Sequence, residues 1–505
     1  MHISVFQFFH ALMPRIWSAI TVSLLAGLVG ISSISFSQNH KLVIQNGATF
    51  NGIGTITVKD SIRNSNSSVP TIITGKVVLS GAAQGIAANA ANGSLRVDTL
   101  SVRGSGVKTI AGTIAVGDSL NILSGTTFNI SSDTLRIGNI VVNAGTITSN
   151  TNSVIEYNRN NGTTQSILGG ASQGKMRLMG NARKSLLGVL TVDSLEHSGW
   201  GLTVNNNLTV NGKTTIDSVI NVTGGTTFSL GANNSTIATL QGNVGVIQAN
   251  STGTLTFTNN ATNGSGTIQT NNSTITFSGN INSTGTLAVT GTGTMAFGGT
   301  VSSITYSFTN GSTEIYNGGV QTVAVANYGN LTLSNAGLKT FAVGTSGIGG
   351  TINLINGATA DATTNSTTIN YNGTGAQTIG ALNYYNLTFS GVHSSAAMTL
   401  PNGGTIRVAG AFTNSATAVT FTNTNNTFEY NGTIAQTVTP FTYYHLTLSG
   451  GGAKTVNADQ TANGDVIQQS GTALTVTNAV TNWQIDGSLT TQTNFIDNGT
   501  ITVGN

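Results

Sequence analysis

Residues 254–297 read TLTFTNNATNGSGTIQTNNSTITFSGNINSTGTLAVTGTGTMAF, and they give the clearest indication of the fold. The stretch contains short runs in which polar and apolar residues alternate, each bounded by Gly, Asn or Ser. Alternation with period two between turn residues predicts β-strands. Phe257, Phe277 and Phe297 recur at a constant spacing of about 20 residues, which predicts that they stack on successive coils of a solenoid.

A longer repeat is superimposed on this spacing in the C-terminal part of the chain. Its layout is Tyr-Asn-Gly, then Gln-Thr followed by Ile or Val, then Leu-Thr-[Leu/Phe]-Ser and, in most copies, Lys-Thr. The central glutamines are Gln321, Gln377 and Gln436, about 57 residues or three coils apart. Residues 100–110 and 176–186 resemble the second half of this unit, which indicates diverged copies earlier in the chain. The copy that begins at Leu387 lacks the lysine.

We therefore predict an all-β parallel β-solenoid with about 20 residues per coil, because one coil is too short to bury its own apolar face and stacked coils share a core. The chain has only 4 prolines, which fits because proline removes a donor from the strand ladder. Only 7% of residues are charged, and outward ladders of Thr and Asn can supply solubility instead. The alternative is a string of β-sandwiches, which would show turns every 8–12 residues or so but no constant coil length.

The N-terminal segment differs from the rest. Arg15 is followed by an apolar stretch, Ile16–Ile31, and Ser35 and Ser37 precede a plausible cleavage point before Gln38. We predict that residues 1–37 are a cleaved export signal. The alternative is a membrane anchor, because the stretch approaches the span of about 20 residues that a transmembrane helix needs.

The predicted mature chain contains no later transmembrane segment. We expect an N-terminal solenoid over residues 38–310, with diverged repeats. A C-terminal solenoid of three units of about 57 residues would follow over residues 311–505, continuous with the first.

Composition excludes several classes of function. The chain has no cysteine, so it has no disulfides and no cysteine-based metal site. The absence of cysteine is compatible with a bacterial surface protein. The net charge is +3, and no Lys or Arg occurs between Lys213 and Lys339. Nucleic-acid binding needs a concentrated basic patch, so we expect no nucleic-acid partner.

The repeat layout, with Y-N-G, A-Q-T, L-T-[LF]-S-G and K-T in order, resembles that of the β-strand-repeat proteins that bacteria of the Bacteroidota type export to their surface. These proteins are adhesin-like. The resemblance covers most of the chain after residue 37. It implies a right-handed parallel β-helix, export, and a secreted or outer-surface location. It carries over no catalytic residue, because the shared positions are structural.

Parallel β-helices of the pectin-lyase-like kind include lyases and glycosidases, which need paired acidic groups. The best candidate pair is Asp98 and Asp118, about one coil apart, with Arg96, Arg103 and Lys108 nearby. The alternative, which we favour, is a solvated outward ladder of charges. We therefore assign no catalytic residues.

Asp193, Glu196 and His197 could offer one imidazole and two carboxylates to a metal ion. A solvated loop is the favoured interpretation of this spacing. We therefore expect no metal site and no cofactor.

Two groups of residues are candidates for contact with a ligand. Paired tyrosines recur in equivalent stretches of the units; they form either an outward strip that stacks on sugar rings or inward plugs, the second being favoured. A basic cluster could bind an acidic glycan or lipopolysaccharide, although a solvated repeat face is the simpler interpretation and Lys184 occupies the lysine position of the repeat. The candidates are Tyr384, Tyr385, Tyr443, Tyr444, Lys175, Arg177, Arg183 and Lys184.

The sequence thus predicts a secreted, non-enzymatic and elongated surface protein that acts as an adhesin, stalk or filament component. Its expected partners are glycans or other surface polymers, with end-to-end self-association between open strand edges. The first alternative is a polysaccharide lyase or glycosidase on the same fold. The second is a self-assembling matrix fibre, since long β-rich stretches of low charge permit cross-β stacking.

Overall fold

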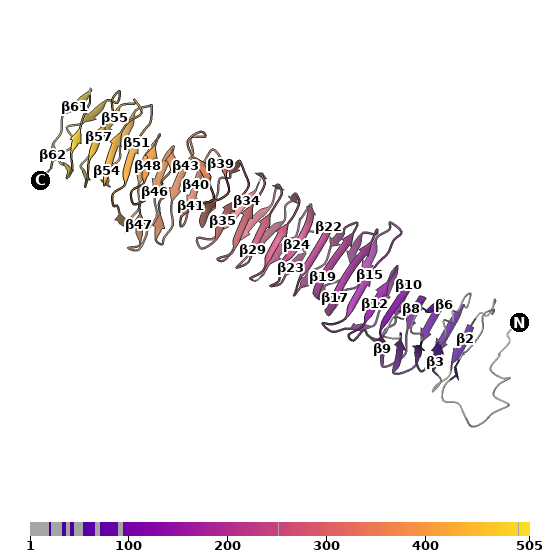
Figure 1. Cartoon of the computed structure of the whole chain (residues 1–505). Coiled ribbons are helices and arrows are strands. Elements are labelled where there is room, and N and C mark those ends of the chain that lie inside the picture. The colour runs from indigo at the N-terminus through magenta and orange to yellow at the C-terminus, as the bar shows by residue number, and fades with distance from the viewer. Residues whose placement is uncertain are drawn as a thin grey trace, which may run out of the picture. The chain divides into compact units, whose positions relative to one another are not determined.

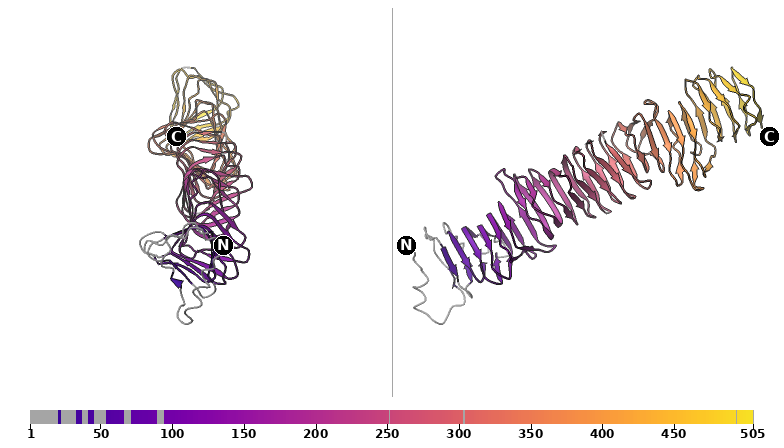
Figure 2. Two further views of the ribbon diagram at one scale, coloured as in Figure 1. Left: turned by 90° about the vertical axis from the view of Figure 1, so that its right-hand side faces the viewer. Right: turned by 180° about the vertical axis from the view of Figure 1, so that it is seen from behind.

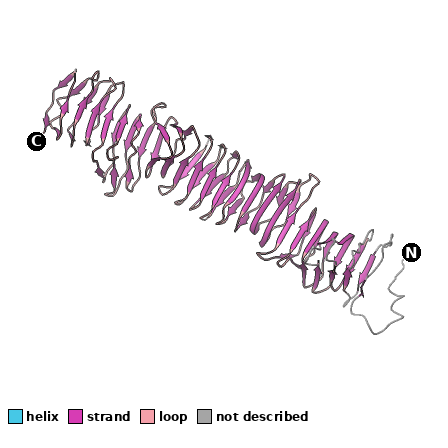
Figure 3. Cartoon of the chain, in the orientation of Figure 1, coloured by secondary structure: helices cyan, strands magenta, loops and turns pink. Residues whose placement is uncertain are grey.

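The computed structural model describes residues 20–21, 33–36, 41–44, 54–65, 71–88, 94–250, 252–302, 304–492 and 494–504. The described residues form strands and turns, without helices (Figure 3). The chain divides into two compact units, Met1–Gln241 and Gly242–Asn505.

Each unit is a parallel β-solenoid, as predicted, with strands side by side in chain order (Figures 1 and 2). In the first unit, β15 (Val154–Tyr157), β17 (Gly170–Gly180), β19 (Leu190–Gly199) and β22 (Thr214–Val222) pair in parallel. Ile155, Met176 and Leu195 are in register on three of these strands and are all buried. Their spacing of about 20 residues matches one coil.

A second column of the first unit follows the first after a corner. It contains β16 (Gln165–Ile167), β18 (Lys184–Leu186) and β20 (Leu202–Val204), again parallel. Earlier coils contribute a seven-stranded parallel sheet. Its members are β1 (Ile20–Thr21), β3 (Leu42–Ile44), β5 (Ile62–Asn64), β7 (Gln84–Ala87), β9 (Val107–Ala111), β11 (Thr127–Asn129) and β14 (Thr146–Thr148).

Most of the predicted export signal, including the cleavage point before Gln38, lies outside the described residues. Two parts of it are described, β1 and β2 (Ser33–Phe36). Strand β1 pairs in parallel with β3, and β2 pairs in parallel with β4 (Thr55–Val58). Within the described residues, no helix is long and apolar enough to cross a membrane.

The phenylalanine column of the second unit confirms the predicted coil length. Phe257, Phe277 and Phe297 are in register on β26 (Thr254–Phe257), β29 (Thr274–Phe277) and β32 (Thr294–Phe297). Their rings are stacked, with centroids 5.0 Å and 6.0 Å apart and planes inclined by 7° and 4°. All three side chains are buried, so this aromatic stack forms part of the core.

Neutral side chains supply many of the polar bonds between the coils of the second unit. At one corner Asn260 accepts a hydrogen bond from the N–H of Asn280, and Asn280 accepts one from the N–H of Thr300, each at 2.9 Å. Inside the coil, Asn243 donates to Asn263 and Asn263 donates to Ser283, each at 2.8 Å. These ladders satisfy turn groups without charge, which explains how the fold tolerates so few ionic residues.

Later coils of the second unit carry the longer repeat. Its first copy uses β35 (Thr313–Tyr316), β36 (Gln321–Val323), β37 (Asn327–Tyr328), β38 (Asn330–Leu333) and β39 (Gly337–Phe341). The second copy uses β43 (Thr368–Tyr371), β44 (Gln377–Thr378), β45 (Asn383–Tyr384), β46 (Asn386–Phe389) and β47 (Ala397–Thr399). The third uses β51 (Thr427–Tyr430), β52 (Gln436–Val438), β53 (Thr442–Tyr443), β54 (His445–Leu448) and β55 (Lys454–Val456).

Candidate functional site

The outward aromatic strip, the less favoured of the two arrangements, does not form. Tyr384 and Tyr443 are fully buried, so no ligand can reach them. Tyr385 and Tyr444 are half-buried, but they lie about three coils apart along the repeat. On the next coils Tyr384 is in register with Val408 and Tyr443 with Ala462. The inward plug is therefore the arrangement of Tyr384 and Tyr443, and Tyr385 and Tyr444 do not line up as a ladder for sugar rings.

The buried tyrosines close the corners of the coils. Tyr371 and Tyr384 share a hydrogen bond of 3.1 Å between their hydroxyl oxygens. The N–H of Gly380 donates to Tyr371 at 3.0 Å, and the hydroxyl of Tyr384 donates to the carbonyl of Gly380 at 2.8 Å. Both backbone groups of one inward-turned residue are thus satisfied by one tyrosine pair. Burial raises the pKa of Tyr371 to about 12.

The same arrangement recurs in the other two copies. Tyr430 and Tyr443 bond each other at 2.9 Å and serve the N–H and carbonyl of Thr439. Tyr316 and Tyr328 bond each other at 3.0 Å and serve Ala324. The tyrosines of the repeat are therefore structural parts of the corner.

The repeat glutamines link each corner to the preceding coil. The amide oxygen of Gln436 accepts the N–H of Gly432 at 2.8 Å, while its nitrogen donates to the carbonyls of Val408 and Gly410 at 2.9 Å and 2.6 Å. Gln321 makes the equivalent three bonds, and so do Gln84 and Gln165 in the first unit. One buried carboxamide thus satisfies three main-chain groups.

The repeat lysines lie one coil above the glutamines and are fully buried. The register pairs Gln84 with Lys108, Gln165 with Lys184, Gln321 with Lys339, and Gln436 with Lys454. The Nζ atoms of three of them donate to corner carbonyls: Lys108 to Ala82 and Ser105, Lys339 to Gly318, and Lys454 to Gly432, all at 2.7–2.8 Å. In the copy that lacks the lysine, Met398 is in register with Gln377.

Lys184 is therefore not available to a ligand, and its assignment to a ligand-binding cluster is wrong. Its side chain is fully buried and its Nζ donates to Gln165 at 2.9 Å. Burial, with a smaller effect from the positive charge of Arg159, lowers the pKa of Lys184 to about 8. The lysine position of the repeat faces the interior, because the ammonium group there donates hydrogen bonds to acceptors at the corner.

Lys175 and Arg177 belong to a ladder in which charges alternate. Arg136, Glu156, Arg177 and Glu196 are in register on four successive coils. Glu196 lies 2.6 Å from Lys175 and 3.3 Å from Arg177, and Glu156 lies 3.5 Å from Arg136. The bond from Lys175 lowers the pKa of Glu196. Lys175 and Arg177 both pair with the one carboxylate of Glu196, which offsets part of their charge, and Arg183 is the exposed member of the cluster outside the ladder.

Asp98 and Asp118 hold backbone and amide groups. Asp98 accepts the N–H of Gly75 at 3.0 Å, and Asp118 accepts the amide of Asn139 at 3.1 Å. Both lie where the pairing of β8 (Ser94–Val102) and β10 (Thr113–Ile122) shifts register. Lys108, a neighbour in the proposed site, is buried in its corner. These contacts fit an outward polar ladder.

Asp193, Glu196 and His197 do not converge on one point. His197 is fully buried, whereas Glu196, the preceding residue on the strand, faces outward among the charge ladder. Burial lowers the pKa of His197 to about 4, with a further effect from the charge of Lys184. In the part of the chain that the structure describes, no group of three His, Asp or Glu residues could hold a metal ion.

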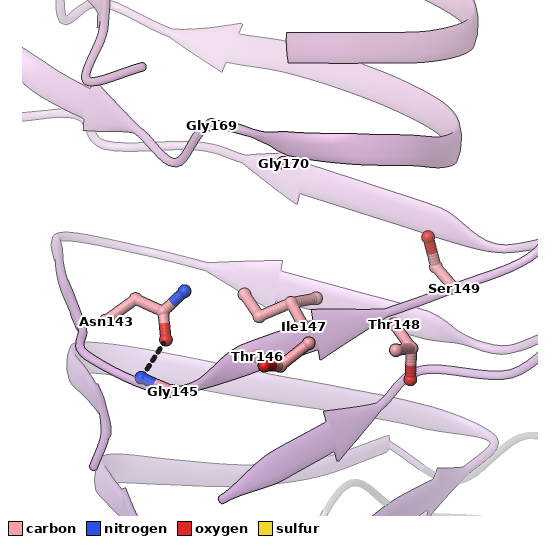
Figure 4. A pocket seen from close by; sticks show the side chains of 8 residues that line it. All are labelled: Asn143, Gly145, Thr146, Ile147, Thr148, Ser149, Gly169 and Gly170. Atoms are coloured by element: carbon pink, nitrogen blue, oxygen red, sulfur yellow. Dashed lines mark hydrogen bonds between the residues drawn. The ribbon is translucent and has the colours of Figure 1, made fainter. Parts of the chain in front are cut away.

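A pocket of about 330 Å³ lies beside β14 in the first unit (Figure 4). Asn143, Gly145 and residues 146–149 form one wall, and Gly169 and Gly170 form the other. Asn143 accepts the N–H of Gly145 at 3.0 Å. The lining presents hydroxyl, amide and backbone groups, so it can offer hydrogen bonds but no side chain that transfers protons near neutral pH.

Comparisons with protein-family models, with curated proteins and with solved structures found no match to this chain. The case for a function therefore comes from the side chains themselves. One exposed residue that the repeat pattern did not single out is Trp200, which sits between two glycines at a corner of the first unit. Its glycine flanks and its place outside the repeat motifs were the available signals.

Proposed function

We propose that this chain is exported and acts outside the cell as a non-enzymatic structural protein, an adhesin or stalk component of the cell surface. One observation carries the proposal: the tyrosine, glutamine and lysine positions of the repeat all face the interior. The tyrosines, glutamines and lysines close corners and join coils, so the repeat preserves a scaffold and no reactive group. A chain whose recurrent residues maintain only its own winding is suited to a mechanical role.

The outward faces support an adhesive role. Thr254, Thr274, Thr294 and Thr313 stand in register on successive coils of the second unit and are all partly exposed. The coils repeat at about 4.8 Å, so such a face presents the same neutral hydroxyl group many times over. Weak contacts that recur along one surface add up to strong attachment through effective concentration.

Cell fractionation and adhesion assays test this proposal. We expect the native protein in the medium or on the outer surface, and we expect a deletion strain to attach less well to surfaces or to other cells, with attachment restored by the complete gene. Retention of the chain in the cytoplasm would refute the proposal. Turnover of a polysaccharide by the purified chain would favour the enzymatic alternative, and fibres seen by electron microscopy would favour the matrix protein.

A further inference from the structure

Trp200 is the more exposed of the two tryptophans that the structure describes. It is 67% exposed, whereas Trp483, the other described tryptophan, is fully buried. Trp200 occupies the corner between β19 and β20. An indole left in water forgoes burial of a large apolar surface, so its exposure calls for a partner or another explanation.

The corner is built by close stacking of the backbone on three successive coils. Gly180 and Gly199 are in register. A Cβ atom on Gly199 would lie 2.5 Å from the carbonyl oxygen of Gly180, and one on Gly180 would collide with the carbonyl of Arg159. Gly180 also has a φ of +83°, which favours glycine. The residues that follow these contact points therefore emerge close together at one corner.

Polar residues follow the contact points on the first two of the three coils, those that contain Arg159 and Gly180. They are Asn160, Asn161 and Asn181, and all three are exposed. The side chain of Asn160 accepts the N–H of Asn181 at 3.2 Å, and that of Asn181 accepts the N–H of Gly162 at 3.4 Å. Asn181 follows Gly180, which is in register with Gly199, so this exposed carboxamide lies one coil below the indole.

Two arginines add positive charge at the corner. Arg183 is exposed and precedes Lys184, whose N–H bonds the carbonyl of Gly201 at 2.8 Å, so Arg183 lies one coil below the Trp200 turn. Arg159 donates to Asn161 at 2.7 Å and to the carbonyl of Thr164 at 2.9 Å. Neither arginine takes part in an ion pair between described residues. Lys175 and Arg177, by contrast, are both bonded to Glu196.

We propose that the Trp200 corner, defined as Arg159, Asn161, Asn181, Arg183 and Trp200, binds an anionic polysaccharide. A sugar ring stacks on the indole, the carboxamides bond its hydroxyls, and the guanidinium groups bond its carboxylate or sulfate groups. The proposal rests on the proposed function and names the class of partner for an adhesive surface.

The surroundings of the corner favour a polysaccharide over an apolar protein partner. Protein interfaces surround an aromatic anchor with further apolar contacts, whereas the exposed residues that the register places on the coil below Trp200 are Asn181 and Arg183. Asp217 is exposed and follows Ile216, which is in register with His197, so it lies one coil above the end of the strand that precedes Trp200. Its charge repels anions there, so a bound chain should run from the indole toward the arginines. The coils are about 4.8 Å apart, a step similar to the length of one sugar unit.

Affinity measurements on the complete exported chain test the proposal. The probes are polygalacturonate and dextran sulfate, with neutral dextran of similar length as the reference. We expect binding of one or both anionic probes and weaker binding of dextran. W200A should weaken binding about tenfold, which is the scale of one aromatic contact. R183Q should weaken it by a similar factor and reduce its dependence on salt.

A matched control is R103Q, which removes an exposed arginine at another corner of the first unit and should leave the affinity unchanged. Trp200 fluorescence should shift on binding, while buried Trp483 stays constant. Circular dichroism checks the fold of each variant. No affinity for either anionic probe, equal affinity for W200A and the wild type, or equal losses in R103Q and R183Q would each overturn the proposal. None of these results concerns export or cell attachment, so they leave the proposed function standing.

Discussion

Replacement of Lys454 by methionine tests whether the buried ammonium groups bear a cost of desolvation. Lys454 is fully buried and donates to the carbonyl of Gly432 at 2.8 Å. Burial lowers its pKa from 10.5 to about 8. Methionine is a natural occupant of this position, because Met398 stands in register with Gln377 in another copy.

The expected signal is a difference in pH dependence. Between about pH 8 and 10.5 the unfolded chain binds a proton at Lys454 that the folded chain has lost, so the free energy of unfolding rises with pH in this window. The full shift is worth about 3 kcal/mol at roughly 1.36 kcal/mol per pKa unit, and about 2 kcal/mol of it appears between pH 7 and 9.5. The K454M variant lacks this rise. Other titrating groups contribute equally to both proteins and cancel in the difference.

At pH 7 we expect K454M to be within about 2 kcal/mol of the wild type. The variant loses a charged hydrogen bond worth about 1.5–3 kcal/mol, but it also loses the burial cost of the ammonium. The disadvantage of K454M should then grow by about 2 kcal/mol on going to pH 9.5.

Urea unfolding followed by the fluorescence of Trp483 provides the assay. Trp483 lies on β59 (Trp483–Ile485) and is in register with Gln460, which follows Lys454 by a few residues. Its fluorescence therefore reports on the coil that adjoins Lys454. Both proteins carry W200F to remove the exposed indole. Measurements at pH 6 and 7 provide an internal reference, where the two curves should run parallel. A difference that stays constant from pH 7 to 9.5 would refute the claim that Lys454 is desolvated.

Three further predictions concern the core and corners of the second unit. Burial raises the pKa of Glu314 to about 7. The folded chain therefore holds this proton more tightly than the unfolded chain, so the free energy of unfolding is highest below about pH 4.5 and falls as the pH rises through 7. E314Q should remove this fall in thermal melts from pH 4 to 8, and an unchanged fall would contradict the assignment. F277A opens a cavity within the phenylalanine stack and should cost about 3–5 kcal/mol in urea unfolding; a loss below about 1 kcal/mol would show that the stack is loosely packed. Q436A leaves the three main-chain groups bonded by Gln436 without partners. It should lower the free energy of unfolding by about 2–4 kcal/mol and speed hydrogen exchange at the Gly432 amide. Unaltered exchange at Gly432 would show that solvent replaces the side-chain amide.

The coil length and the direction of the strand faces followed from the sequence. Phe257, Phe277 and Phe297 could be placed in register because a solenoid allows little choice: one spacing repeats, and a slip by one residue would turn every apolar side chain outward. The alternation of Thr with Leu, Ile or Phe fixes which residues face the core. Local pattern and tertiary packing agree here, since each coil makes the same contacts with its neighbours.

The direction of the side chains at the corners could not be obtained in this way. A repeat motif shows that a residue recurs, but it does not show which way the residue points, since a corner breaks the alternation. The sequence leaves the direction of Tyr384 open, with an inward plug favoured, and places Lys184 on a solvated face. Both are buried. Corner residues turn N–H and carbonyl groups inward, and the hydroxyl, amide and ammonium groups of the repeat bond them there. Two further contacts could not be obtained from the sequence because they join residues about one or two coils apart. One is the pairing of Glu196 with Lys175 and Arg177, and the other is the grouping of Trp200 with Arg159 and Arg183. Contacts of this kind depend on register and corner length together, and those are fixed only when the coils stack.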